Sequence, residues 1–600
     1  MRFFPRFKLG NILCCLVLAA WSGHAQPSGG PYGPLPETYE APKDAAHIYY
    51  VAPDGQTNAS GTTLAEPTTL DSAIARVVTG DAIILRGGTY RIGGLQFNQG
   101  ITIQPYADEH PVLKGTLVAT NWLAQTNGLW RVAWTNLFPS KPADWWRRER
   151  EGTRTPPYRF NNDMVFVDGQ LLTAVGWDGE VTTNSYFIDY DAGQIYIGAN
   201  PANHLIEITA YDGALLRTTN TVHGKTSDGK GPVIRGITFT QYAYRALEVE
   251  GKEPVGLSDP ATYGKDVTNT VLENDTISYC SRVAGYFRGD HFTMRHCLIS
   301  DTRTEGVYVI GSADVLLEKN IFRRNNIQQM TGYFPAAVKI FNQCYRATCR
   351  DNLVIDQPYS NGIWYDVGNV DCVFINNYVE NAIDGFFFEI SKRAICAGNV
   401  FIHCDHGIRA LNSTNVEAYH NTLIDAQASF ERTARSGVND HFGWHPFTGP
   451  DVNQREGHVF VGNLVVEDEA SQKPFFQATQ APTLCGSLTN SQLARLDDNA
   501  YIRSSEPLDV FAIWSPAEGV NCTAQYKTLD QFQQANPQFE KRSRYFGASY
   551  GAIFKGAELG NYELIRPLPE MENSLPPNVQ QLLGWSKRDV LTPGACPLRR

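Results

Sequence analysis

The sequence predicts an all-β fold, a right-handed parallel β-helix with β-rich insertions and an N-terminal capping helix. Three observations predict it: a phrase that recurs about every 22–25 residues from residue 230 onward, short alternating strands in both halves of each repeat, and many Gly (52) with few Met (5). A fixed period of this length indicates a solenoid, in which each repeat packs on its neighbours. Leucine-rich repeats fit less well, because the Leu pattern is missing and no half of the repeat has helical apolar spacing.

An asparagine column marks a bend in each repeat. It begins at Asn274, has His296 in place of Asn in the next repeat, and continues after a long insertion at Asn463. The members between them are Asn320, Asn352, Asn377, Asn399 and Asn421. A side-chain amide can hydrogen-bond to its copies in the coils above and below, and so satisfy polar groups at a turn that water does not reach. We therefore expect the column to be structural.

The first residues predict export. Three basic residues precede the apolar run 12–20, and a small-residue cleavage site follows near Ala25, which is the pattern of a signal peptide over residues 1–25. No other apolar run reaches the ~18 residues that a membrane span needs. We expect a secreted or periplasmic protein without a membrane partner. The formal net charge of −11 also disfavours nucleic acid as a partner.

The rest of the chain is predicted to be one catalytic domain. Residues 26–46 are expected to form a linker and residues 47–600 the β-helix, with a capping helix over 69–77 and insertions at about 104–232 and 433–456. Most cysteines lie in strand-like runs, and their spacing fits no zinc pattern. Three lie outside those runs, where a disulfide would suit an exported protein, namely Cys485, Cys522 and Cys596.

The second half of each repeat begins with a small residue followed by an alternating strand. Side chains alternate between faces along a strand, so residues two and four after the small residue are expected to face outward. The nearer outward position carries Tyr308, Lys339, Trp364, Phe387, Arg409 and Phe430. The farther position carries Ile310, Phe341, Asp366, Glu389, Leu411 and Arg432. Large aromatic side chains mixed with both signs of charge predict a sugar-binding groove rather than a plain solvated face.

An outer face covered by a long loop is the other interpretation of this pattern. The aromatic and basic stretch 145–158, which ends at Tyr158, predicts such a loop over the groove. The predicted substrate-binding residues are Tyr308, Lys339, Trp364, Phe387, Arg409 and Arg432.

Two carboxylates occupy the same outward position in successive coils. Asp366 and Glu389 are one coil apart, and stacked strands are about 4.8 Å apart, so we expect their carboxyl groups about 5 Å from each other. That is close to the ~5–5.5 Å separation in retaining glycosidases. Because two like charges this close do not both ionise freely, one group is suited to be an acid. Glu389 follows three Phe residues and is the expected acid/base, and Asp366 is the expected nucleophile.

Two other functions remain open at this point. Lys339 and Arg409 flank the pair, and either is a candidate base for a polysaccharide lyase that abstracts the proton next to a uronate carboxylate, with Asp366 and Glu389 holding calcium. A non-catalytic carbohydrate-binding β-helix is the third interpretation, since fold alone does not choose among them. The hydrolase requires no cofactor, whereas calcium suits the lyase.

The two acidic phrases resemble a known group. Gly362-Ile-Trp-Tyr-Asp366, followed one coil later by Phe386-Phe-Phe-Glu389-Ile-Ser391, is similar to the motif of the right-handed parallel β-helix glycoside hydrolases that include bacterial β-xylosidases. The resemblance implies that Asp366 is the nucleophile and Glu389 the acid/base. We expect the substrate to be a plant or algal polysaccharide or its oligosaccharides. Phrases near residues 49–55 and 582–585 are similar to the same group.

Overall fold

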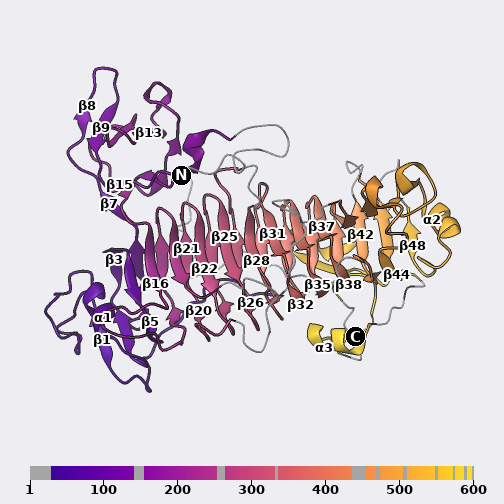
Figure 1. The fold of residues 1–600 in the computed structure, drawn as a ribbon, viewed down its shortest axis with the longest axis horizontal. Coiled ribbons are helices and arrows are strands. Elements are labelled where there is room, and N and C mark those ends of the chain that lie inside the picture. The colour runs from indigo at the N-terminus through magenta and orange to yellow at the C-terminus, as the bar shows by residue number, and fades with distance from the viewer. Residues whose placement is uncertain are drawn as a thin grey trace, which may run out of the picture.

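The structure is a computed structural model of the chain. It describes residues 29–140, 155–252, 264–330, 335–434, 454–467, 473–503, 510–547, 552–569, 571, 575–586 and 591–596. Three sheets of 13 strands each run the length of the molecule and form the faces of a right-handed parallel β-helix (Figure 1). The predicted fold class is confirmed.

Each full coil contributes one strand to each of the three sheets, which we number in the order that a coil visits them. The first sheet contains β1 (Ile48–Val51), β2 (Ala82–Leu85), β5 (Thr102–Pro105), β17 (Val233–Arg235), β20 (Val271–Glu273), β23 (Thr293–Arg295), β26 (Leu316–Glu318), β29 (Thr348–Arg350), β32 (Val370–Ile375), β35 (Lys392–Ala397), β38 (Thr414–Tyr419), β41 (His458–Val461) and β44 (Leu493–Asp497).

The second and third sheets follow the same order along the axis. The second contains β3 (Gly88–Arg91), β6 (Pro111–Lys114), β18 (Thr238–Thr240), β21 (Thr276–Ser278), β24 (Leu298–Ser300), β27 (Ile321–Arg323), β30 (Leu353–Ile355), β33 (Tyr378–Glu380), β36 (Val400–Ile402), β39 (Thr422–Ile424), β42 (Leu464–Glu467), β45 (Ala500–Arg503) and β48 (Arg544–Phe546). The third contains β4 (Leu95–Phe97), β16 (Gly213–Arg217), β19 (Arg245–Val249), β22 (Val283–Arg288), β25 (Glu305–Ile310), β28 (Ala336–Phe341), β31 (Asn361–Asp366), β34 (Asp384–Glu389), β37 (His406–Leu411), β40 (Gln427–Arg432), β43 (Phe476–Gln480), β46 (Ala512–Trp514) and β47 (Ala524–Tyr526).

Helices lie at both ends of the β-helix (Figure 1). The predicted N-terminal capping helix is α1 (Leu70–Arg76), which buries Leu70, Ala73 and Ile74 against the first coil. At the other end α2 (Leu529–Ala535) buries Phe532 in the same core. The third helix, α3 (Pro577–Leu583), lies along the outside of the coils beside β35 and caps neither end. None of the helices in the described ranges is long and apolar enough to cross a membrane. The end helices cover core side chains that a further coil would otherwise cover.

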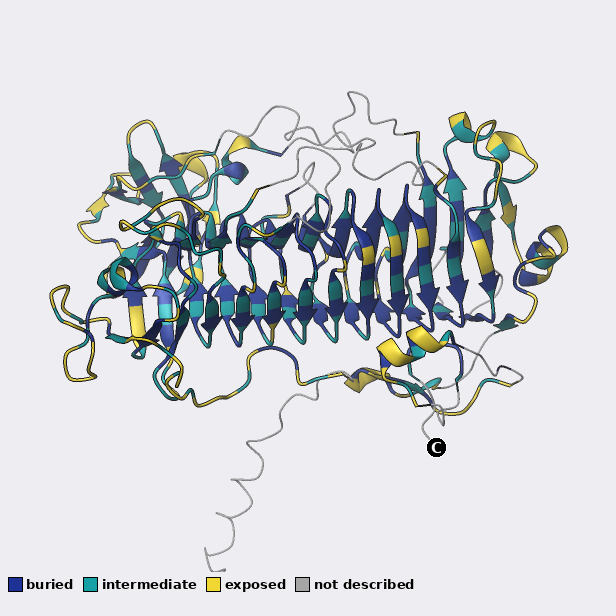
Figure 2. Ribbon diagram, turned by 60° about the horizontal axis from the view of Figure 1, so that its bottom comes forward, coloured by how far each residue is buried: buried dark blue, intermediate teal, exposed yellow. Residues whose placement is uncertain are grey.

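The core is one continuous apolar column inside the coils. It extends from Val51 in the first coil to Phe539 beyond the last, and it includes stacked rings such as Phe374 and Phe401, whose centroids are 6.1 Å apart. Figure 2 shows that the coil strands are mostly buried, while exposed residues gather in the turns, the insertion and the end caps. Because side chains of adjacent coils interdigitate here, a slip of one residue would turn the apolar set outward.

The asparagine column forms a hydrogen-bonded ladder, which confirms its predicted structural role. From Asn320 to Asn499, each Nδ2 donates to the Oδ1 of the next member, over distances of 2.9–3.2 Å. The residue before each of these members has a positive φ, so the chain turns sharply there and brings every amide to the same place. Buried amides and backbone groups at the turn are thereby satisfied.

Two members of the predicted column are wrong by one residue. Asn274 and His296 have φ of 57° and 51° and so occupy the left-handed turn position, not the ladder position. The ladder position in those coils holds Asp275, whose Oδ1 accepts from the Ile237 N–H (2.9 Å), and Cys297, whose N–H donates to the Asn320 Oδ1 (2.9 Å). Asn, like Gly, tolerates the left-handed region, which is why Asn274 resembles a ladder residue in sequence.

The insertion consists of two small, mostly antiparallel sheets. One contains β7 (Thr116–Val118), β10 (Val165–Val167), β11 (Gln170–Leu171) and β15 (Ile206–Thr209); the other contains β8 (Leu123–Ala124), β9 (Trp130–Ala133), β12 (Thr173–Ala174), β13 (Ser185–Asp189) and β14 (Gln194–Ile197). They lie within the predicted interval 104–232, whose two ends belong to coil strands β5, β6 and β16. Glu207 anchors the insertion, since its buried carboxylate pairs with Arg91 (2.6 Å) and Lys114 (2.7 Å) of the second sheet.

The N-terminal segment 29–46, predicted to be a linker, is packed along the outside of the coils. The Gly33 N–H donates to the Lys319 carbonyl (2.8 Å), and the Tyr39 N–H donates to the Ala107 carbonyl (2.9 Å). Tyr32 is buried in a small apolar cluster with Tyr378. The segment is therefore a strap that crosses several coils. The predicted signal peptide 1–25 lies outside the described residues, as does most of the predicted insertion 433–456.

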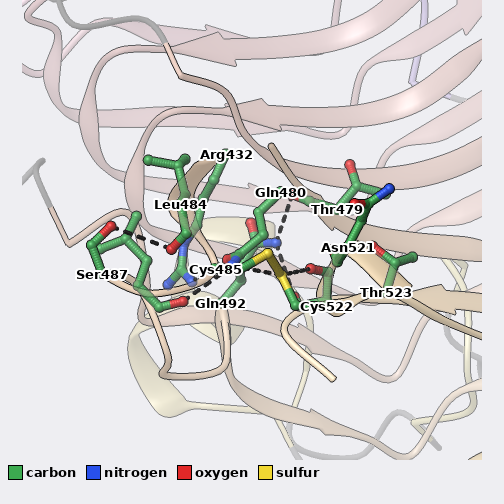
Figure 3. Close-up of a disulfide and its surroundings, with 12 residues drawn as sticks. Arg432, Thr479, Gln480, Leu484, Cys485, Ser487, Gln492, Asn521, Cys522 and Thr523 are labelled. Carbon is green, nitrogen blue, oxygen red and sulfur yellow. Dashed lines mark hydrogen bonds between the residues drawn. A yellow bond between two sulfur atoms is a disulfide. The ribbon is translucent and has the colours of Figure 1, made fainter. Parts of the chain in front are cut away.

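A disulfide joins Cys485 and Cys522, two of the three cysteines singled out in the sequence (Figure 3). They follow β43 and β46, neighbouring strands of the third sheet. The Gln480 Nε2 lies 3.3 Å from the Cys522 Sγ and links the bridge to the end of β43. The disulfide thus ties together two loops that leave the same edge of the β-helix.

Removal of one ladder amide should destabilise the whole solenoid. In the wild type the Asn377 N–H donates to the Asn399 Oδ1 (2.8 Å), and the Asn399 Nδ2 donates to the Phe374 carbonyl (2.9 Å). Asn399→Ala leaves both of these buried backbone groups without that partner. Buried polar groups left unsatisfied cost about 1–3 kcal/mol each, so we expect the free energy of unfolding to fall by about 3 kcal/mol in urea titrations. Asn184→Ala, at an exposed position of the insertion, should change it by less than about 0.5 kcal/mol. Equal effects would contradict the ladder's role.

A second prediction concerns Glu540, which lies where the ladder ends. It is fully buried, accepts from Tyr501 (2.5 Å) and Ser543, and burial raises its pKa to about 7, although these hydrogen bonds oppose the rise. An unfolded Glu has a pKa of about 4.3, so the folded state binds more protons between these values. The stability that this group contributes is fully present below about pH 4.3, the pKa of the unfolded state, and is lost as pH rises through about 7.

We therefore expect wild-type stability in urea to fall from pH 5 to pH 8 by an amount that Glu540→Gln removes. Over this interval the free energy of unfolding of the wild type should fall by about 3 kcal/mol more than that of Glu540→Gln. Glu558→Gln, at an exposed position, should keep the wild-type slope. A pH slope in Glu540→Gln as steep as that of the wild type would contradict the assignment.

Candidate active site

Asp366 and Glu389 are direct neighbours in the third sheet. Strands β31 and β34 pair in parallel with Asp366 opposite Glu389. The residues between the outward ones, Tyr365 and Phe388, are fully buried in the core, so both acids lie on the outer face. Phe341 precedes Asp366 and Leu411 follows Glu389 in the same column, so the two carboxylates stand between apolar neighbours along the sheet.

Lys339 interacts directly with the first acid of the pair. Its Nζ lies 3.0 Å from the Asp366 Oδ2, and the two side chains are 17% and 14% exposed. The same ammonium lies 3.8 Å from the centroid of the Trp364 ring. The carboxylate and the ring face both favour a cation at this place. Lys339 therefore balances one negative charge of the pair and fixes the Asp366 carboxylate.

The nearer outward column forms a stack of alternating character. Lys339, Trp364, Phe387 and Arg409 are opposite one another on four successive strands. The Trp364 and Phe387 rings are stacked, with centroids 5.0 Å apart and an angle of 17°, and Arg409 lies 4.9 Å from the Phe387 centroid. Both aromatic residues are buried, in a cluster with Leu411. The stack is thus a firm floor under the site, closed at each end by a cation.

Arg409 is held by two carboxylates that do not belong to the pair. It donates to Asp384 and to Glu431, each at 3.0 Å. Burial lowers the pKa of Arg409, but Asp384 and Glu431 more than offset this, and the net pKa is raised. For Asp384, burial acts to raise the pKa, but the hydrogen bonds to His406 and Arg409 outweigh burial, and the net pKa of Asp384 is lowered. Arg409 is therefore a permanent cation engaged in a fixed network.

A third outward column escaped the sequence analysis. It consists of the residue just before each small residue. The strand bends at the small residue, so that this residue and the next one, for example Ala337 and Val338, both face the core. The residue before them therefore faces outward. The outward orientation is shown by Ala336, which packs on Trp364, and by Asp384, which binds Arg409. A signal was present, since this position is polar in otherwise apolar strands. Its polar members are Glu305, Asn361, Asp384, His406 and Gln427.

Glu305 of this column adds a second buried acid near the stack. It is fully buried, and burial raises its pKa, although Arg282, Thr304, Tyr308 and Lys339 oppose the rise. Tyr308, a predicted substrate-binding residue, is opposite Lys339 in the sheet. Its ring makes edge contact with Phe341 at 5.2 Å. The side of the site toward the N terminus is therefore acidic and aromatic.

Arg432 does not lie on the outer face, and this prediction of its position is wrong. The pairing of β37 with β40 shifts by one residue, so that Ser429 and Glu431 face outward while Phe430 lies in the core. Arg432 is buried beside the disulfide (Figure 3). It donates there to the Arg455 and Asn490 carbonyls, each at 2.9 Å. Burial lowers its pKa to about 10. The repeat is one residue shorter here, which inverts the alternation.

The described residues contain no group of three or more His, Cys, Asp or Glu side chains that could hold a metal ion. Of the stretch 145–158, only 155–158 is described, and Tyr158 belongs to the insertion rather than to the coils. The predicted residues that do come together are Asp366, Glu389, Lys339, Trp364, Phe387 and Tyr308. Arg409 closes the stack on the far side.

Comparisons with known proteins bear on the fold. Residues 234–464 match the family model described as periplasmic copper-binding protein (NosD). No curated protein matches the chain in sequence. A solved complex of XylC with xylose is similar over 85% of this chain and 88% of that one, with a TM-score of 0.55 and 13% identity.

Two further solved structures are less similar. A glycoside hydrolase has a TM-score of 0.38 and 12% identity, over 78% of this chain and 95% of that one. The family 28 exopolygalacturonase of Yersinia enterocolitica has a TM-score of 0.33 and 11% identity, over 76% and 72%. The likeness to XylC shows that both chains share the parallel β-helix fold.

The Arg409 network yields a stability prediction. Arg409→Met leaves Asp384 buried without its cation, and breaking a buried pair costs about 3–5 kcal/mol, so we expect a loss of about 2–3 kcal/mol at pH 7 for this partly buried arginine. Because the pKa of Asp384 is lowered in the folded state, its stabilisation is present above about pH 4 and is lost as pH falls further. The deficit of the variant in urea unfolding should therefore shrink at pH 3.

The matched control is Arg393→Met, which breaks the exposed ion pair with Asp371 in the neighbouring first sheet. Exposed pairs contribute at most about 1 kcal/mol, so this variant should stay close to wild type at both pH values. If Arg409→Met were no more destabilising than Arg393→Met, the network would have no structural role.

Proposed function

We propose that the protein is a retaining glycoside hydrolase. The observation that carries the proposal is the pairing of Asp366 with Glu389 on adjacent strands, both on the outer face, with the Lys339 ammonium 3.0 Å from Asp366. Adjacent strands are about 4.8 Å apart, which suits the ~5–5.5 Å carboxyl separation of retaining enzymes. Inverting enzymes need a wider gap, about 6.5–9.5 Å, to hold a water molecule.

The two acids differ in surroundings, and the difference supports the roles that we propose for them. Asp366 is more exposed and paired with Lys339, which suits a carboxylate that attacks the anomeric carbon. Glu389 is more buried and is followed by Leu411, which suits a carboxylic acid that holds a proton until transfer. Glu389 protonates the leaving oxygen as Asp366 forms the glycosyl–enzyme bond. Glu389 then accepts a proton from the water that attacks the anomeric carbon and releases Asp366.

The lyase alternative is less well supported. A lyase base must offer a lone pair, whereas Lys339 makes an ion pair and a cation–π contact, both of which are interactions of an ammonium ion. Arg409 is a cation with raised pKa, held by Asp384 and Glu431. The ammonium beside Asp366 also disfavours calcium at the pair, because two cations would share one carboxylate. We therefore propose hydrolysis without a metal ion.

The proposed substrate is a plant or algal polysaccharide or one of its oligosaccharides, cleaved outside the cell or in the periplasm. The fold shared with XylC, whose complex contains xylose, and the match to a family described as periplasmic support this class and location. The aromatic floor of Trp364 and Phe387, with Lys339 and Arg409 at its ends, supports binding of a sugar above it. Bacterial β-xylosidase-like activity is the specific form to test first.

The two acids should fail in different ways when they are removed. Asp366→Ala loses the nucleophile, so we expect kcat/KM to fall by about 10³-fold or more on every substrate. Glu389→Ala loses only proton transfer, worth about 10²–10⁴-fold, so it should keep most of its first-step rate on 2,4-dinitrophenyl glycosides, whose leaving group needs no acid. Azide should accelerate turnover of Glu389→Ala on that substrate. Asp371→Ala, which removes an exposed carboxylate nearby, is the matched control and should keep wild-type kinetics.

The assay begins with wild-type protein on a glycan panel, followed by mass spectrometry of the products. Products heavier by one water indicate hydrolysis, and products with an added double bond indicate a lyase. Full activity in both Asp366→Ala and Glu389→Ala would overturn the assignment. Glycan binding without any product would identify a carbohydrate-binding protein instead.

A further inference from the structure

The insertion contains a cavity that lies apart from the acidic pair. Its volume is about 460 Å³. Its walls come from residues 139–140, the short 3₁₀-helix Pro157–Phe160, residues 174–176 and strand β13. Ligand pockets typically enclose about 300–1,000 Å³. The cavity is thus large enough for a small ligand or one residue of a polymer.

Four aromatic side chains line the cavity. Tyr158, Phe187 and Tyr190 line it and are partly exposed, whereas Tyr186 lines it from a buried position. The Phe187 ring is backed by Tyr196, with centroids 5.9 Å apart. Partly exposed rings on a sheet offer flat apolar faces, and the C–H face of a pyranose ring is flat and apolar in the same way. Such walls are held in place before any ligand arrives.

Among the lining residues that the structure describes, Asp163 is the one acid, and hydrogen bonds hold its carboxyl group in place. The Asp163 Oδ2 accepts from the Phe138 N–H and the Tyr190 hydroxyl, each at 2.8 Å, and its Oδ1 accepts from Thr209 at 3.2 Å. Burial raises the pKa of Asp163 to about 6, although these bonds oppose the rise. Its carboxyl group is therefore committed to orienting Tyr190. An uncharged ligand fits this cavity better than an ionic one.

Donors and acceptors for hydroxyl groups remain at the rim. The Asn161 Oδ1 accepts from the Ser140 N–H at 3.2 Å, which orients the amide and leaves its Nδ2 as a donor. Ser140 and Tyr158 contribute hydroxyl groups to the same wall. Flat rings beside a few hydroxyl and amide groups are the combination that suits a neutral sugar.

Arg303 connects this cavity to the coils. Its guanidinium donates to the Asn161 carbonyl at 3.1 Å and the Asp163 carbonyl at 3.0 Å. Arg303 lies two residues before strand β25, which is two strands from β31 in the third sheet. Strand spacing and rise place Asp366 about 10 Å along the axis and roughly 17 Å across the sheet from the start of β25. The cavity is therefore several sugar units from the acidic pair, toward the N-terminal end of the third sheet.

We propose that the cavity lined by Tyr158, Phe187 and Tyr190 is a distal subsite that binds one neutral sugar residue of a polymeric ligand. It rests on the proposed function only for the class of ligand, since binding here requires no cleavage. A chain bound at both places would be longer than a disaccharide. The subsite therefore favours oligomers and polymers over short glycosides.

The test measures binding without hydrolysis. Isothermal titration calorimetry of the full-length Asp366→Asn variant uses xylohexaose, cellohexaose and mannohexaose as probes, each compared with its monosaccharide. We expect at least one hexasaccharide to bind, and Tyr158→Ala with Phe187→Ala in the same background to raise its Kd about tenfold or more. Leu123→Ala, at an exposed residue of the same small sheet, should leave the Kd unchanged.

A second variant guards against misfolding of the first. Ala174→Trp adds a ring to a residue that lines the cavity and should also abolish binding, because it fills the space instead of emptying it. Failure of all three hexasaccharides to bind, or wild-type affinity in both cavity variants, would overturn the proposal. A wild-type protein that releases no product yet binds in this pattern would refute only the proposed hydrolase.

Discussion

The vertical stacking of the coils is the constraint on which the rest of the structure depends. The amides from Asn320 to Asn499 bond to one another through seven coils, and the left-handed residue before each of them makes every turn alike. Apolar side chains inside the coils add a second reason for the same register. Because register is fixed at the bend, the outward side chains of the third sheet are fixed as well, and Asp366 must lie beside Glu389.

Placing two carboxylates side by side has an electrostatic cost, which the surrounding columns offset. Lys339 balances Asp366 from the strand before, and Arg409 separates Asp384 from Glu431 on the other side. Between these cations lies the apolar stack of Trp364 and Phe387. The charges of the outer face thus alternate along the axis, and one pair of acids remains together on adjacent strands.

Periodicity made the coils and the acidic pair predictable from the sequence. It failed where the repeat length changes by one residue, as at Arg432, and where a turn residue resembles a ladder residue, as at Asn274 and His296. The outward position of Asp384 was missed because the bend at the small residue interrupts strict alternation. The cavity beside Tyr158 joins segments far apart in the chain, with Arg303 bridging the insertion to a coil, and no local pattern encodes such contacts.

The central claim is that two acids stacked on adjacent strands act as nucleophile and acid/base on one glycosidic bond. The most direct measurement is the configuration of the anomeric carbon in the sugar first released, followed by proton NMR before mutarotation equilibrates it. With Asp366 as the nucleophile, the anomeric carbon undergoes two displacements, first by Asp366 and then by water. Each one inverts its configuration, so the account predicts that the first product keeps the configuration of the substrate. First release of the opposite anomer would contradict it, because a single displacement by water leaves Asp366 no role as a nucleophile.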